Sequence, residues 1–169
     1  MSREQMSDVA KPWRAVFLAG LAGGMAEVIW VAGYSAVSGG DGWQVAREVS
    51  AAISPAWAGL DAAPVIGLGI HFLLSVLLAG AFMITLWAPY LRCRGVVAVL
   101  IAGPIALAGV WAMNFLVVLP VVHPAFVQLL PYPVSLGSKI LFGLAMSVAL
   151  IVREISALPV KDGRRMTCA

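Results

Sequence analysis

Charged residues are scarce in this chain of 169 residues. Only 11% of the residues are Asp, Glu, Lys or Arg, whereas 62% are hydrophobic and the mean hydropathy is +0.96. A typical soluble domain has about a quarter charged residues and is about half apolar. The composition therefore excludes a soluble globular domain, a disordered tail and a nucleic-acid-binding protein. It indicates a helical integral membrane protein.

Cysteine is also rare, and the sequence lacks catalytic motifs. We expect Cys93 and Cys168 to lie in the reducing cytoplasm, which argues against a structural disulfide, and their wide separation makes a poor metal motif. No Ser/His/Asp set, phosphate-binding glycine loop or pair of metal-binding carboxylates is present. We therefore expect a protein without enzymatic activity, cofactor or metal.

Long apolar runs are present instead. A membrane-spanning helix needs roughly 20 mainly apolar residues, and four runs are long enough: about 14–36, 63–88, 95–120 and 134–152. They are continuously apolar rather than alternating, which excludes a transmembrane β-barrel. The first run is too long for a signal peptide, so we expect it to remain as a signal anchor. The sequence predicts an all-α bundle of four transmembrane helices, with residues 1–169 as a single membrane domain.

Basic residues fall almost entirely on one side of these predicted spans. One basic residue, Arg47, is on the outer side, and Lys139 lies within a span. The nine on the inner side are Arg3, Lys11, Arg14, Arg92, Arg94, Arg153, Lys161, Arg164 and Arg165. The positive-inside rule then places both termini in the cytoplasm, as an even number of spans requires. We expect a multi-pass protein of the bacterial inner membrane.

The outer side is predicted to carry a short helix. Asp41 and Gln44 have the spacing of a helix N-cap and its reciprocal partner, so we expect a helix over residues 42–53. Its apolar residues suggest that it lies in the outer interface. The Pro-rich stretch 123–133 is expected to be a hydrophobic loop in the same interface.

Glycines on the first span predict close helix packing. Gly20 and Gly24 form a small-xxx-small pair, which lets a second helix approach closely. We favour packing within the monomer over a dimer face.

Four polar residues interrupt the spans, one in each: Glu27, His71, Asn114 and Lys139. Their distances from the predicted outer helix ends place all four roughly 9–12 Å below the outer surface, at a rise of about 1.5 Å per residue. Polar groups inside a bilayer are costly and usually face the protein interior. We therefore predict an intramembrane polar layer.

Several interpretations of this layer remain open. It could be a structural network, in which Glu27 and Lys139 neutralise each other while His71 and Asn114 complete the hydrogen bonding. It could be a proton or ion relay through Glu27 and His71, or a site for a small ligand such as a lipid or quinone. A haem site would need His71 and His123 as axial ligands, although His123 lies about 10 Å further out.

Short motifs give the chain a family resemblance. The Glu of the first span, GIHFLLSVLLAGAF at 69–82, MNFLVVLP at 113–120 and KILFGLAMS at 139–147 resemble the YagU-like proteins, a group of small bacterial inner-membrane proteins. The resemblance implies four helices and an inner-membrane location, and it implies no established activity. In that family the last motif usually begins with His. Lys139 here weakens a metal or His-based proton role and favours a Glu27–Lys139 pair.

These observations lead to a ranked set of functional hypotheses. The first is a non-enzymatic accessory subunit of a larger membrane complex, such as a respiratory one. The second is a small proton-coupled transporter that uses Glu27, His71 and Lys139. The third is a haem- or metal-binding electron carrier. The expected partners are the lipid bilayer and other membrane subunits or further copies of the chain, with no role for nucleic acid.

Overall fold

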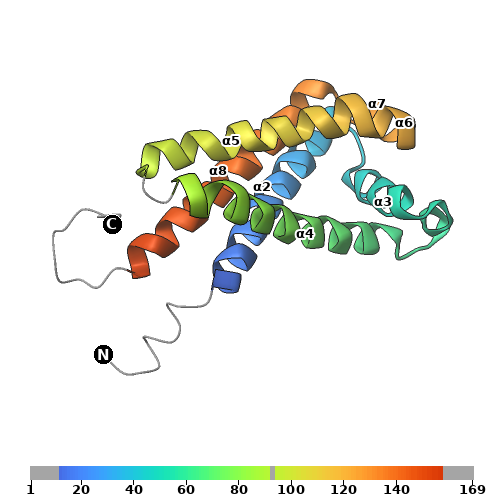
Figure 1. Ribbon diagram of the computed structural model, residues 1–169. Coiled ribbons are helices and arrows are strands. Elements are labelled where there is room, and N and C mark those ends of the chain that lie inside the picture. The colour runs from blue at the N-terminus through green and yellow to red at the C-terminus, as the bar shows by residue number, and fades with distance from the viewer. Residues whose placement is uncertain (1–11, 92–93, 158–169) are drawn as a thin grey trace.

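A computed structural model describes residues 12–91 and 94–157 of the protein (Figure 1). The described residues form helices and turns, with no strand among them. Four stretches of this part of the chain are long and apolar enough to cross a membrane: Trp13–Ser38, Ala63–Leu91, Val96–Val122 and Tyr132–Ile155. The protein is an all-α, four-helix membrane bundle, as the composition predicted.

Each span is built from one or more helical elements. The first half of the described chain contains α2 (Pro12–Ser38), α3 (Gly42–Ile53), the 3₁₀-helix η1 (Pro55–Gly59), α4 (Ala63–Phe82) and the π-helix η2 (Met83–Leu91). The second half contains α5 (Val96–Met113), the π-helix η3 (Asn114–Val118), α6 (Leu119–Val122), α7 (Pro124–Leu129) and α8 (Tyr132–Ala157).

The four spans form an open arc rather than a closed ring. α2 packs against α4 on one side and α8 on the other, and α5 packs against α8. Within the described residues α4 has no comparable contact with α5, and the second span contacts α5 mainly through η2, next to the connection. Figure 1 shows α3 at one end of the bundle, where it packs against α4 and meets α7. We call this the α3 end.

Glycine allows the spans to approach closely. A Cβ atom on Gly20 would lie 2.5 Å from the Cα of Val76, and one on Gly24 would lie 2.7 Å from the Ser75 hydroxyl. Both glycines therefore face α4 of the same chain.

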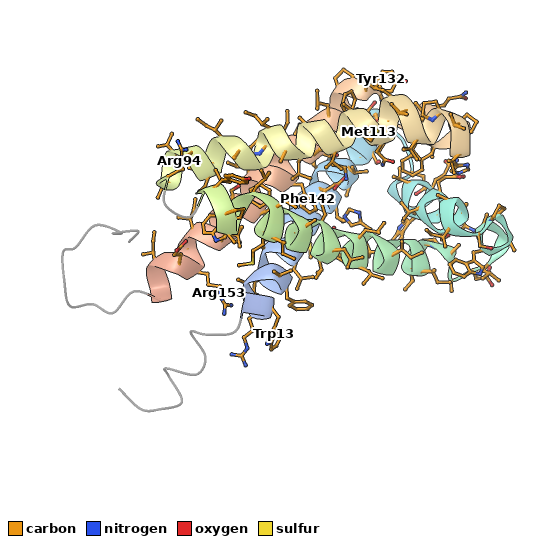
Figure 2. The ribbon with its side chains drawn as sticks, in the orientation of Figure 1. Trp13, Arg94, Met113, Tyr132, Phe142 and Arg153 are labelled. Carbon is orange, nitrogen blue, oxygen red and sulfur yellow. The ribbon has the colours of Figure 1, made fainter. Side chains whose placement is uncertain are left out.

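The core of the bundle lies around α8, away from the α3 end. Phe142, labelled in Figure 2, and Met146 belong to α8, and both side chains are fully buried. Next to them α8 touches α5 backbone to backbone, since a Cβ on Gly143 would lie 2.6 Å from the carbonyl of Gly103. This half of the molecule is tightly packed and leaves little freedom between α5 and α8.

Apart from Lys139, which lies within a span, the described basic residues lie towards the two ends of the bundle. Trp13, Arg94 and Arg153 lie at the end away from α3, whereas Tyr132 lies near the α3 end (Figure 2). Arg47 is in α3, where its guanidinium donates to the carbonyls of Ala58 and Leu60. The predictions for Cys93, Cys168 and the remaining basic residues of the tails and the second connection fall outside the described residues.

The short helix α3 begins where the sequence predicted. The Asp41 carboxylate accepts a hydrogen bond from the Trp43 N–H at 2.8 Å, whereas the Gln44 backbone N–H donates to the Asp41 carbonyl at 3.1 Å. Gly67 of α4 allows a close approach, because an added Cβ would lie 2.8 Å from the carbonyl carbon of Ala46. α3 is thus docked on α4 rather than lying alone in the interface.

Two local features differ from the sequence prediction. The stretch 123–133 is not a loop throughout, because α7 forms after a break at His123 (φ −151°, ψ 71°). The second and third spans also contain the π-helical turns η2 and η3, which the sequence analysis did not predict. η2 contains Pro89, and Pro120 follows η3. A proline ring crowds the carbonyl four residues earlier, and a wider helical turn relieves that contact.

Candidate functional site

A cavity of about 730 Å³ lies at the α3 end of the bundle. All four residues of the predicted polar layer line it: Glu27, His71, Asn114 and Lys139. They come from α2, α4, η3 and α8, so every span contributes one. α3 and α7 line the cavity as well. Its volume is within the range of about 300–1,000 Å³ that is typical of small-molecule sites.

Glu27 and Lys139 form an ion pair in this cavity. The Lys139 ammonium lies 2.6 Å from Oε1 and 2.7 Å from Oε2 of Glu27, and the Ser138 hydroxyl donates to Oε1 at 3.2 Å. The side chains are 16% and 12% exposed for Lys139 and Glu27 respectively. The pair expected from the sequence is therefore present. It leaves the polar layer without net charge, because each ion is neutralised by the other.

His71 is not joined to that pair by a hydrogen bond. Its Nε2 lies 3.2 Å from the carbonyl oxygen of Gly24. A carbonyl can only accept, so Nε2 carries the hydrogen, and Nδ1 of the neutral ring is an acceptor. Among the interactions of the described residues, none involves Nδ1. His71 lines the cavity, and its Nδ1 is a hydrogen-bond acceptor without a partner among the described residues.

Asn114 has no hydrogen-bond partner for its side chain within the part of the chain that the structure describes. Every fully buried side-chain nitrogen or oxygen in that part has a partner, so the Asn114 amide is not fully buried, and Asn114 is one of the residues that line the cavity. The predicted structural network is thus only partly formed: the ion pair is present, but Asn114 does not complete it.

The π-turn η3 positions Asn114. Its carbonyl accepts the Leu119 N–H five residues later, which is the hydrogen bond of a π-helix. π-turns inside α-helices occur frequently at functional sites. In the sequence, Pro120 could have indicated this π-turn, because a proline ring disfavours a regular α-helical turn before it.

Two tryptophans that the sequence analysis did not single out hold the start of α8. The Trp30 indole donates to the Val134 carbonyl at 3.0 Å, and the Trp111 indole donates to the Ser135 hydroxyl at 3.0 Å. α2 and α5 are thereby each tied to α8 beside the polar layer. Their position in the sequence could have identified these residues. Both tryptophans lie within a span, where the indole N–H needs a hydrogen-bond partner.

The remaining cavity wall is mainly apolar. Its apolar side chains include Val28, Val31, Trp43, Ile53, Leu68, Ile70, Leu74, Phe115, Leu119, Phe126 and Leu130. The cavity is partly open rather than enclosed, and Leu74, which lines it, is 52% exposed on α4. Its neighbours Leu73 and Leu77 are exposed apolar residues of the same span. This opening therefore faces the hydrocarbon region of a membrane.

Outside the cavity lining, an acid–imidazole contact joins α3 to the α6–α7 segment. His123 Nε2 lies 2.9 Å from Oε2 of Glu48, and both side chains are 23% exposed. Residues so far apart in sequence give no local pattern that would have predicted this contact. It holds α3 against the end of the third span and so helps to enclose the cavity.

The arrangement gives a haem site no support. His71 lines the cavity and bonds to Gly24, whereas His123 lies outside the lining and bonds to Glu48. No group of three or more His, Cys, Asp or Glu residues within 12–91 and 94–157 is placed to hold a metal ion.

No protein-family model, curated protein or solved structure matches the chain. The resemblance to the YagU-like proteins stays a prediction. What the cavity can bind therefore has to follow from its own residues.

Proposed function

We propose that the protein is a non-enzymatic, multi-pass membrane protein that binds a small amphipathic molecule in the cavity. The observation that carries this proposal is that Asn114 lines a cavity of about 730 Å³ while its amide is not fully buried and has no partner among the described residues. Small-molecule sites typically combine mainly apolar walls with a few polar groups that fix the ligand's orientation.

A purely structural role for the polar layer explains less. Protein interiors are close-packed, with few voids larger than a water molecule. A structural polar network also stabilises a protein best when every member has its partner. The cavity meets neither condition, because it is large and because the Asn114 amide and His71 Nδ1 remain available.

We further propose a bacterial inner-membrane location with cytoplasmic termini, which puts the α3 end on the outer side. This proposal is supported by the end-to-end separation of Arg47 from Arg94 and Arg153. The cavity would then open towards the outer leaflet.

Native mass spectrometry of the purified protein in mild detergent tests the ligand-binding proposal. We expect a bound amphiphile that is retained by the wild type and by Gln128→Leu, which removes an exposed amide outside the cavity lining. Asn114→Leu removes an amide that faces the cavity and should lower occupancy. An empty wild-type protein that takes up no added lipid or other amphiphile would contradict the proposal.

A second candidate is the role of accessory subunit in a larger membrane complex. It is favoured by an exposed stripe on α5, formed at four-residue spacing by Val97, Ile101, Ile105 and Gly109. Nothing lies within 4 Å of a Cβ built on Gly109, so a helix of another subunit could approach closely there. Co-purification of a stoichiometric partner tests this role, and a chain that is recovered alone and monomeric from its native membrane would count against it.

A proton-coupled carrier is the remaining proposal, since the Glu27–Lys139 pair is reachable from the cavity. Glu27→Gln should then abolish proton-coupled flux in proteoliposomes while the protein stays folded. Unchanged flux would exclude it.

A further inference from the structure

We infer that the cavity binds a neutral para-quinol, the reduced form of a membrane quinone, in preference to a charged lipid. This inference rests on the proposed ligand-binding function and names the ligand class. It follows from the net charge of the polar layer, from the placement of its free hydrogen-bonding groups on two walls, and from the polarity of those groups.

The charge of the polar layer favours an uncharged ligand. The Glu27 carboxylate already has the Lys139 ammonium at 2.6 Å. An anionic head group could reach Lys139 only by competing with Glu27, and it would leave one negative charge without compensation. Uncompensated charge in a low-dielectric site is strongly unfavourable. A cationic head group would compete with Lys139 for Glu27 and would leave one positive charge without compensation.

The free hydrogen-bonding groups come from two different walls. His71 Nδ1 belongs to α4, and the Asn114 amide belongs to η3 at the end of α5. α4 and α5 are the two ends of the arc and do not pack against each other at this level. Both residues line the cavity, so a molecule held between α4 and η3 can meet one polar side chain from each. A lipid with a single head group uses one such wall, whereas a para-quinol carries oxygens at opposite edges of its ring.

The donor or acceptor character of these groups favours the quinol over the quinone. Since His71 Nε2 donates to the Gly24 carbonyl, Nδ1 offers a lone pair, which a quinol hydroxyl can donate to. A quinone carbonyl at that position would face another acceptor. The Asn114 amide can donate to or accept from the second hydroxyl. Phe115 and Phe126 supply apolar ring surface, and the opening at Leu74 gives a chain on the ring a route to the lipid.

A matched series of probes tests the inference under anaerobic conditions. We would titrate the detergent-purified protein with a decyl benzoquinol, the corresponding decyl benzoquinone and decanoate, which share an apolar chain and differ in the polar group. Quenching of tryptophan fluorescence is a suitable readout for the two ring compounds, since Trp43 lines the cavity. The binding of decanoate is measured by its competition with bound quinol. We expect the quinol to bind most tightly and decanoate least tightly.

Variants then locate the binding. Loss of one hydrogen bond should weaken quinol binding roughly three- to tenfold in Asn114→Leu and in His71→Phe. Gln128→Leu is the matched control and should bind as the wild type does. Thermal unfolding identifies a variant that does not fold, and His71→Gln replaces His71→Phe in that case.

The outcomes separate this inference from the proposed function. Quinone binding as tight as quinol binding, or equal binding by Asn114→Leu, overturns the inference. Tight binding of decanoate or of a phospholipid without quinol binding also overturns it, while it leaves the ligand-binding function standing. If native mass spectrometry finds no amphiphile and none of the probes binds, both the quinol inference and the proposed ligand-binding function are wrong.

Discussion

At the scale of single residues, the ion pair is the most costly feature of the protein. A carboxylate and an ammonium inside a membrane lose most of their hydration, and their mutual attraction repays this only in good geometry. Glu27 meets Lys139 through both oxygens and accepts a further hydrogen bond from Ser138. Removing one partner should therefore be far more harmful than removing both.

A double-mutant cycle tests this expectation. Glu27→Gln or Lys139→Met alone should each lower the free energy of unfolding by up to about 3–5 kcal/mol, because an unpaired charge or unmet acceptor remains. The double variant should lose much less than the sum of the two. Thermal or chemical unfolding in detergent, followed by circular dichroism, measures all four proteins. Strictly additive losses would show that the two side chains do not stabilise each other.

The four residues that the sequence placed at one level line the same cavity, but not all of their hydrogen bonds could be predicted. Glu27, His71, Asn114 and Lys139 could be placed at one level because the apolar runs defined the helix ends. The bond from His71 to the Gly24 carbonyl could not be predicted, because it depends on the close approach that Gly20 and Gly24 allow between α2 and α4. The open amide of Asn114 depends on a π-turn that hydropathy does not register.

At the scale of elements, the docking of α3 on α4 determines how far the cavity is enclosed. The contact depends on Gly67, where any side chain would meet the backbone of Ala46. Gly67→Ala should push α3 away from α4 and destabilise the protein by about 1–3 kcal/mol, as expected for overpacking. The melting temperature in detergent and the affinity for the cavity ligand should both fall.

Gly69 offers a matched control on the same helix. Nothing lies within 4 Å of a Cβ built there. Gly69→Ala should be neutral, or stabilising by up to about 1 kcal/mol, because alanine favours the helix. Equal effects of the two substitutions would mean that α3 is not held through Gly67.

A second glycine pair tests the packing of the two α-helices at the core. Gly103→Ala should destabilise the protein, because the added Cβ would lie 2.5 Å from the Gly143 carbonyl oxygen. Gly109→Ala on the same α5 should not, since its Cβ has no neighbour within 4 Å. Unfolding midpoints of both variants provide the comparison, and a stable Gly103→Ala protein would refute the backbone contact.

At the scale of the whole molecule, the orientation in the membrane can be tested directly. A green fluorescent protein fused to the C-terminus should fluoresce in a bacterial host, and alkaline phosphatase fused there should be inactive, because we expect that end in the cytoplasm. Alkaline phosphatase inserted at the exposed Asp61, between η1 and α4, should be active. The opposite pattern would invert the topology and place the cavity in the inner leaflet.

Composition alone was enough to predict the four-helix architecture, because long apolar runs have few alternatives in a membrane. It could not predict the order of the spans around the bundle. That order depends on which small residues meet, such as Gly20 with Val76 and Gly143 with Gly103. The open arc, and hence the cavity, is a property of those contacts.

The opening at Leu74 changes how affinity must be expressed. A ligand that arrives through hydrocarbon first dissolves in the bilayer, so the protein responds to the mole fraction of ligand among the lipids and not to its concentration in water. Adding empty micelles or vesicles dilutes such a ligand and weakens apparent binding even when the protein is unaltered. Comparisons between variants are therefore meaningful only at a fixed ratio of protein to detergent or lipid.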